Sequence, residues 1–99
     1  MTEPTWVEWA DEALRQLDQA HDYITLASGA AVADRITEHI FATAQQLSRF
    51  PMSGRTGRVA RTRELVLSRT PFVLAYSLEH DRIRILAVYH GAQRWPQAF

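Results

Sequence analysis

The apolar residues of this chain change their spacing once, near its middle, and that change limits the folds open to it. In the first half they recur every three or four residues, as at Leu14, Leu17 and Ile24, which is the period of an amphipathic helix. After Phe50-Pro51 and a polar loop, β-branched and aromatic residues fill short segments, a pattern typical of strands. The spacing therefore predicts an α+β fold with most of its helix before its sheet.

Start and stop signals define the elements expected in the first half. The segment Thr5–Trp9 is short and rich in β-forming residues, so it predicts an opening strand. Asp11 is suited to cap a helix that runs to Ser28-Gly29, and Ser28 is suited to cap a second one. The second helix should end at Phe50-Pro51, because proline disfavours helical geometry in the residue before it. The short connection makes the two helices an antiparallel hairpin.

A loop and three strands are expected in the second half. Residues 52–61 contain two glycines, three arginines and no apolar period. The predicted strands are Arg63–Arg69, Phe72–Glu79 and Arg82–His90, joined by turns short enough for an antiparallel meander. We therefore expect a short N-terminal strand and an antiparallel helix hairpin packed on a three- to four-stranded antiparallel sheet.

The last two predicted strands are apolar at nearly every position, which indicates that both faces of the sheet are covered. The helix hairpin accounts for one face. A partner protein, or the first strand together with the C-terminal tail, is the candidate cover for the other.

Length and composition favour one domain spanning residues 1–99. A chain of 99 residues with 46 % hydrophobic content is long enough for a single core. The absence of cysteine excludes disulfides and thiolate metal sites and favours a reducing cytoplasm. The N-terminus lacks a leader pattern, and no segment approaches the roughly 18 apolar residues of a membrane span. We expect a cytoplasmic protein with no membrane partner.

The net charge of zero conceals opposite charges in the two halves. Residues 1–48 carry two arginines and eight acidic residues, a net charge of −6, whereas residues 49–99 carry nine arginines and three acidic residues, a net charge of +6. The chain has no lysine. A basic half predicts a polyanionic partner, although pairing between acidic helices and a basic sheet would produce the same division.

Candidate catalytic residues lie among the arginines of the second half. Histidine is the usual proton carrier near neutral pH, so His90 is a candidate acid or base and Glu64 a candidate base. Arg63 and Arg84 could stabilise charge on a phosphate, with Tyr89 near the leaving group. This set suits metal-free RNA cleavage. Strict alternation along the last strand places Arg84 and His90 on one face. The simpler alternatives are a salt bridge for Glu64 and a local hydrogen bond for His90.

Other polar residues have simpler expectations. Arg55, Arg58 and Arg61 in the loop are candidates for nucleic-acid binding. His21 and His39 lie on or beside the apolar stripes, so we expect them to pack or to hydrogen-bond within the helix pair. Neither a His-x-x-x-His spacing nor paired carboxylates occur, so no metal and no cofactor is expected.

Several short motifs follow one another in the second half of the chain: Phe50-Pro51 with Gly54-Arg55, Arg63-Glu64-Leu65, Pro71-Phe72 with Tyr76, and Ile83-Arg84-Ile85-Leu86 leading to His90-Gly91-Ala92. With these motifs the sequence resembles the RelE/ParE superfamily of bacterial type II toxins. The likeness covers essentially the whole chain and implies the RelE/ParE-like fold. It also implies a toxin that halts growth until a cognate antitoxin binds it in a hetero-oligomer.

The resemblance leaves two mechanisms open. RelE-like members cut messenger RNA in the ribosome, which would make Glu64, His90, Arg63, Arg84 and Tyr89 the catalytic positions of an endoribonuclease, or mRNA interferase. ParE-like members inhibit DNA gyrase without nuclease activity. In this chain the helix pair or the C-terminal tail would then make the inhibitory contact, and the arginine-rich loop of residues 52–61 would face either RNA or the gyrase and DNA complex. RelE uses lysines where this chain has arginine and threonine, but some relatives use a glutamate and a histidine. We expect ribosome-dependent mRNA cleavage, with gyrase inhibition as the alternative.

Overall fold

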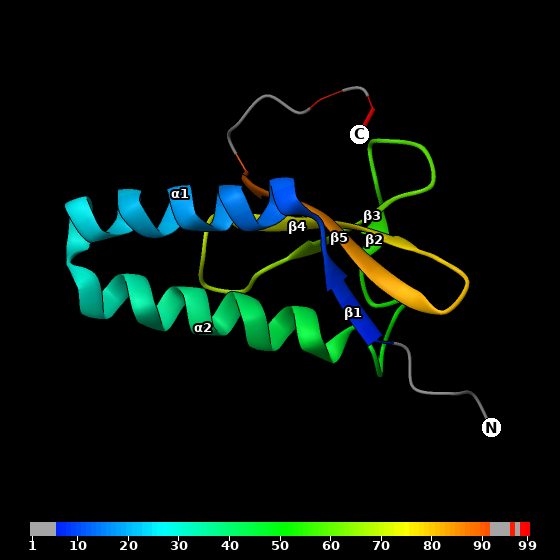
Figure 1. The fold of residues 1–99 in the computed structure, drawn as a ribbon, viewed down its shortest axis with the longest axis horizontal. Helices are drawn as coiled ribbons and strands as arrows, with labels where there is room; N and C mark the ends of the chain where they lie inside the picture. The colour runs from blue at the N-terminus through cyan, green and yellow to red at the C-terminus, as the bar shows by residue number, and fades with distance from the viewer. Residues whose placement is uncertain (1–5, 92–95, 97) are drawn as a thin grey trace.

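The structure is a computed structural model that describes residues 6–91, 96, 98 and 99 (Figure 1). It is an α+β fold in which two helices form one layer and a five-stranded sheet the other. Neither helix in the described ranges combines the length and the apolar character that a membrane crossing demands. The elements are β1 (Trp6–Trp9), α1 (Asp11–Ser28), α2 (Ala30–Gln46), β2 (Arg55–Thr56), β3 (Arg63–Val66), β4 (Phe72–Leu78) and β5 (Arg82–His90).

The helix hairpin turns at Gly29, whose φ of 94° is a conformation that glycine adopts far more readily than other residues. Both expected caps are wrong by one residue or more. Asp11 is the first residue of α1, where its charge favours the helix dipole, and Ala10 takes the capping position. Ser28 ends α1, and Gly29 precedes α2.

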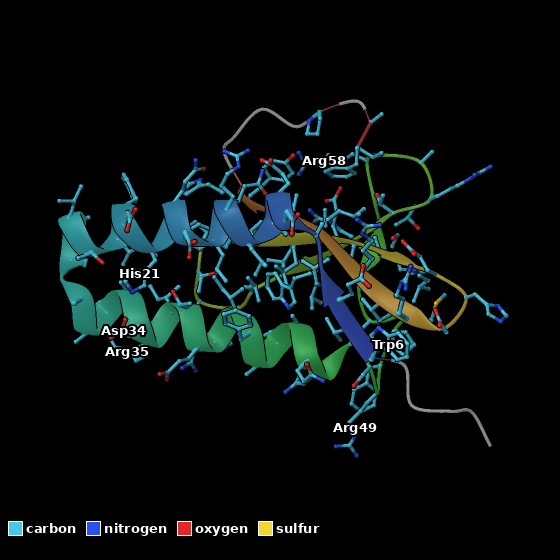
Figure 2. The ribbon with its side chains drawn as sticks, viewed as in Figure 1. Trp6, His21, Asp34, Arg35, Arg49 and Arg58 are labelled. Carbon is cyan, nitrogen blue, oxygen red and sulfur yellow. The ribbon has the colours of Figure 1, made fainter. Side chains whose placement is uncertain are left out.

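The His21 prediction is confirmed, because its Nε2 lies 2.7 Å from Asp34 Oδ1 across the hairpin. Figure 2 shows this pair between α1 and α2.

The sheet has the strand order β1-β5-β4-β3-β2. The α+β fold class and the β3-β4-β5 meander are confirmed, but the sheet is larger than the expected three to four strands and is mixed. β1 pairs in parallel with β5, from Trp6 opposite Arg82 to Trp9 opposite Ile85. β2 is two exposed residues within the loop of residues 52–61, the arginine-rich loop, so it has no apolar pattern that could have predicted it.

The main core lies between the helices and one face of the sheet. Burial of apolar surface there is the main stabilising term of such a fold. Ala and branched residues on the helices meet aliphatic and aromatic residues of β4 and β5. Fully buried members of this core include Ile40, Leu47, Leu74, Tyr76, Ile83 and Ile85.

A β-bulge in β5 changes which residues face the helices. Ala75 of β4 pairs with Ala87, while the next residue, Tyr76, pairs with Ile85, so Leu86 is an extra residue on β5. Beyond the bulge Val88 belongs to the helix-facing core. The expected strict alternation along this strand is therefore wrong.

The second face of the sheet carries a smaller cluster of Ala75, Ala87 and Tyr89. The ring of Phe99 stacks on that of Tyr89, with centroids 6.3 Å apart and an angle of 27° between the planes. The C-terminal tail, one of the expected alternatives, thus covers part of this face.

Candidate functional site

Glu64 is the centre of a charged network at one edge of the sheet. Its side chain is only 2 % exposed. Its Oε1 accepts hydrogen bonds from Arg55, at 3.2 Å from Nε and 2.9 Å from Nη2. Its Oε2 accepts the backbone N–H of Arg58 at 2.7 Å, and the Nε of Arg58 lies 3.6 Å from Oε1. The salt-bridge alternative for Glu64 is confirmed, because one carboxylate holds two arginines.

The environment of Glu64 keeps it ionised. Burial on its own raises the pKa of this carboxyl, but the Arg58 N–H and the Arg55 and Arg58 guanidiniums together outweigh burial and lower the pKa below its usual value. A general base works best when its pKa lies near the operating pH. Glu64 is therefore better suited to holding the loop than to taking a proton from a ribose hydroxyl.

Arg63 and Tyr76 fasten the start of the arginine-rich loop. The Nη1 of Arg63 donates to the carbonyl of Gly54 at 2.6 Å and to that of Met52 at 3.4 Å. The hydroxyl of Tyr76 donates to the carbonyl of Pro51 and accepts the N–H of Gly54, each at 2.9 Å. A Cβ on Gly54 would lie 2.6 Å from the Tyr76 Oη, so the close contact between the Gly54 backbone and Tyr76 requires glycine at this position. The guanidinium of Arg63 thus contacts the chain's own backbone.

The tip of the loop is held by its own hydrogen bonds. The N–H of Gly57 donates to the carbonyl of Thr62 at 2.8 Å, and the Thr62 Oγ1 donates to the carbonyl of Val59 at 2.7 Å. Arg61 is exposed and has a φ of 64°, in the left-handed region. The Arg58 side chain, labelled in Figure 2, is 49 % exposed. The loop therefore presents its arginines on an ordered turn, and Glu64 already offsets part of their charge.

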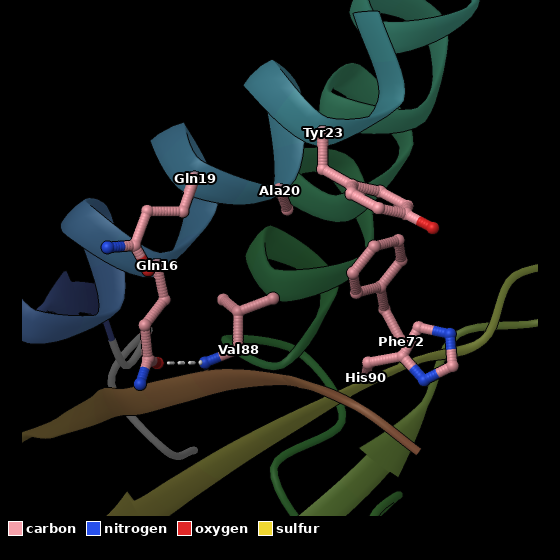
Figure 3. A pocket seen from close by; sticks show the side chains of 7 residues that line it. All are labelled: Gln16, Gln19, Ala20, Tyr23, Phe72, Val88 and His90. Carbon is pink, nitrogen blue, oxygen red and sulfur yellow. Dashed lines mark hydrogen bonds between the residues drawn. The ribbon is translucent and has the colours of Figure 1, made fainter. Parts of the chain in front are cut away.

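His90 lies on the other face of the sheet, against the helices. It lines a hollow of about 270 Å³ between α1 and the sheet, shown in Figure 3. The His90 and Phe72 rings meet edge to face with centroids 5.9 Å apart. Among the described residues, the remaining lining is amide, aliphatic and phenolic, with neither arginine nor carboxylate: Gln16, Gln19, Ala20, Tyr23 and Val88.

Arg84 and Tyr89 occupy two further environments. Arg84 lies opposite Glu8 in the β1-β5 register, with its Nε 3.9 Å from Glu8 Oε1, and Arg82 approaches the other oxygen at 3.5 Å. Tyr89 is 8 % exposed, and burial raises the pKa of its phenol. A phenol with a raised pKa releases its proton less readily near neutral pH.

The five candidate catalytic residues do not converge on one centre. Glu64 pairs with Ala75 and so lies on the second face, whereas His90 beyond the bulge shares the helix-facing side with Val88. The expectation that Arg84 and His90 share a face is wrong, because Leu86 shifts the alternation between them. Along β4 the partners of Glu64 and His90 are three residues apart, or about 10 Å.

Two groups of polar residues were not predicted as parts of a site, and His39 in the second group was expected only to pack or to hydrogen-bond within the helix pair. The contact of Glu8 with Arg82 and Arg84 depends on the parallel pairing of β1 with β5. The alternation of residues within one strand does not predict which strand lies next to it. A hollow between α2 and the β3-β4 turn is lined by Arg35, His39 and Arg69. The sequence shows only that Arg35 and His39 are four residues apart and so share a helix face, and it gives no sign that Arg69 lies near them. No group of three potential metal-ligating side chains occurs among the described residues.

Comparison with known sequences identifies clear relatives. Residues 7–95 match the family model described as ParE toxin of type II toxin-antitoxin system, parDE. A curated protein of Sinorhizobium fredii named "Putative toxin Y4kP" is 40 % identical over 91 residues, which cover 92 % of this chain and 93 % of that protein.

Two solved structures share the fold. A chain of the chromosomal ParDE TA system from P. aeruginosa superposes with a TM-score of 0.83 at 23 % identity, covering 90 % of this chain and 98 % of that one. A chain of the toxin-antitoxin complex RelBE2 from Mycobacterium tuberculosis superposes with a TM-score of 0.67 at 24 % identity, covering 94 % and 98 %. At these identities the likeness concerns the fold.

Proposed function

Since the chain belongs to the ParE toxin family of type II toxin-antitoxin systems, we propose that it stops growth by inhibiting DNA gyrase without cutting RNA. A cognate antitoxin would hold it inactive in a hetero-oligomer. The ParDE and RelBE2 systems of the structural neighbours support such a partner. We thus favour the alternative mechanism over the ribosome-dependent mRNA cleavage that we first expected from the sequence.

The observation that carries this choice is the separation of Glu64 from His90 on opposite faces of the sheet. Cleavage at a ribose 2′-hydroxyl needs a base and an acid that both reach one phosphate, each within hydrogen-bonding distance of its proton. Glu64 is bonded to Arg55 and Arg58 and its pKa is lowered, and none of the described residues that line the hollow at His90 is an arginine that could stabilise a phosphate. These contacts support structural roles for both residues.

The arginine-rich loop is the surface that we assign to gyrase or its bound DNA. Arg55 and Arg58 have side chains that are 55 % and 49 % exposed, and Arg61 is exposed at the tip. Their positions are held by Glu64 and by hydrogen bonds within the turn, so little ordering is needed when they bind. An acidic segment of the antitoxin could cover the same surface in the resting complex.

The test compares gyrase activity and message integrity. Purified toxin is added to a gyrase supercoiling assay, and primer extension is run on abundant messages after brief induction without antitoxin. We expect supercoiling to fall equally with the natural chain and with His90→Gln, while messages stay intact. Discrete cuts within translated codons that disappear in His90→Gln would overturn the proposal and restore the nuclease mechanism.

A matched pair of arginine variants tests the loop itself. Arg61→Gln and Arg49→Gln each remove one exposed guanidinium, the first from the loop tip and the second from the segment after α2. We expect Arg61→Gln to weaken gyrase inhibition several-fold and Arg49→Gln to leave it unchanged. Equal inhibition by the two variants would exclude the loop as the contact surface.

A further inference from the structure

A basic hollow lies between α2 and the turn that joins β3 to β4. Its volume is about 530 Å³, and none of the residues that line it in the described part of the chain is acidic. Glu64 lies near the start of β3, whereas this turn follows its end, so the hollow is separate from the arginine-rich loop. Figure 2 shows Arg35 on α2, far from Arg58. The lining residues are Arg35, Ile36 and His39 from α2 and Ser68, Arg69 and Thr70 from the turn.

The α2 side of the hollow follows from helix geometry. Arg35 and His39 are four residues apart, so their side chains lie one above the other on the same helix face. Ile36 beside them is partly buried and packs against the main core, which anchors this face of the helix. The side chains of Arg35 and His39 therefore lie beside an apolar residue that is fixed by its packing against the core.

The turn side holds Arg69 in an unfavourable backbone conformation. Its φ of 65° lies in the left-handed region, where glycine or asparagine is normally found. Thr70 fixes the turn, because its Oγ1 donates to the carbonyl of Leu67 at 3.0 Å and accepts the N–H of Phe72 at 3.1 Å. An arginine kept at a strained position is an observation that suggests a use for its side chain.

The arginines of the hollow differ from most others in the chain in having no internal partner. Within residues 6–91, neither the Arg35 nor the Arg69 side chain makes a hydrogen bond or an ion pair. Asp34, next to Arg35 in the sequence, is bonded to His21 instead. Two guanidiniums and an imidazole consequently surround the same concave space without a carboxylate to neutralise them.

We propose that this hollow binds a phosphate group. Guanidiniums bind phosphate oxygens through paired N–H groups, and His39 and the Ser68 hydroxyl add further donors. Donors on α2 and on the turn match the several oxygens of a phosphate better than the two of a carboxylate. This site does not depend on the gyrase mechanism proposed above. Its ligand is either a backbone phosphate of a nucleic acid or a small phosphate compound.

The test is an NMR titration of the full chain with inorganic phosphate at low ionic strength. We expect saturable shifts of the His39 imidazole and of the Arg35 and Arg69 Nε–H signals. Arg69→Gly should weaken the phosphate affinity at least tenfold. Arg61→Gly is the matched control, because it also removes one guanidinium from a left-handed position, and it should keep the affinity within about twofold.

Three results would overturn the site. They are an absence of saturable shifts, an equal loss of affinity in both variants, and a response of His39 to polyglutamate but not to phosphate. A second arm identifies the source of the phosphate. If a 12-base-pair DNA duplex displaces inorganic phosphate from the His39 signal, the ligand is a nucleic-acid backbone, and if it does not, the ligand is a small phosphate compound.

Discussion

The arginine-rich loop and the basic hollow show two uses of the same residue type in one small protein. In the loop, a buried carboxylate gathers Arg55 and Arg58 into one network. In the hollow, Arg35 and Arg69 lie around open space, and within the described ranges neither side chain has a partner. The dense arginine cluster is the partly neutralised one, and the dispersed pair is the free one.

The density of arginines along a chain therefore does not report how much charge is available to a ligand. A carboxylate that is 2 % exposed must be paired, because an isolated buried charge is very costly. Arg55 and Arg58 therefore contribute first to folding the loop, and only their exposed parts remain for binding. Arg69 contributes nothing comparable to the fold, so its charge remains for a partner.

Glu64→Gln should disrupt the arginine-rich loop and have the largest effect on stability. The amide keeps the shape of the side chain but loses the charge that two guanidiniums and a backbone N–H are arranged around. Because both arginines can reach water, we expect a loss of about 2 kcal/mol in the free energy of unfolding, less than for a fully buried pair. Urea unfolding measures it, and Tm should fall by about 10 °C.

Glu79→Gln is the matched control for that variant. Glu79 also pairs with an arginine, with 3.3 Å between its Oε1 and the Nε of Arg82, but both side chains are about one third exposed. Exposed pairs contribute little, so the loss should stay below about 0.5 kcal/mol. Equal losses in the two variants would mean that Glu64 does not organise the loop.

Acid should remove the stabilisation by Glu64 within a defined pH range. The folded-state pKa of this carboxyl is lowered, so its contribution is fully present above its unfolded pKa of about 4.3 and is lost as pH falls through the folded value. The difference in unfolding free energy between the natural chain and Glu64→Gln should be constant from pH 7 to 5 and shrink below about pH 4. An increase in this difference as pH falls from 7 to 6 would instead indicate a raised folded-state pKa, as a general base requires.

Much of the fold could be predicted because apolar periodicity reports which residues are buried. The helix pair and the meander follow from the change of period after Phe50, and their packing follows from the need to bury both. Helix caps depend on the backbone angles of single residues, and the order of strands in a sheet depends on pairings between segments far apart in the sequence. For this reason Asp11 was misplaced as a cap and the parallel β1-β5 pairing was missed.

The candidate site was less predictable because it depends on the bulge at Leu86. One inserted residue changes which face a strand residue occupies, and Leu86 has the same apolar character as its neighbours. The salt-bridge reading of Glu64 needed only neighbouring arginines and was confirmed. The hollow at Arg69 depends on a positive φ at a residue type that rarely adopts it, which composition does not reveal.

Substitution of Arg61 or Arg69, which both have a left-handed backbone conformation, should have the smallest effect on stability. Arg61 and Arg69 have φ of 64° and 65°, and neither side chain makes a hydrogen bond or an ion pair within residues 6–91. Glycine removes about 1–2 kcal/mol of left-handed strain at either position but adds about 0.5–1 kcal/mol of chain entropy to the unfolded state. Arg61→Gly and Arg69→Gly should therefore each stabilise the fold by about 0.5 kcal/mol, measured as an upward shift of the urea midpoint. A destabilised Arg69→Gly beside a stabilised Arg61→Gly would mean that Arg69 supports the fold, and the division between structural and available arginines would then fail at the hollow.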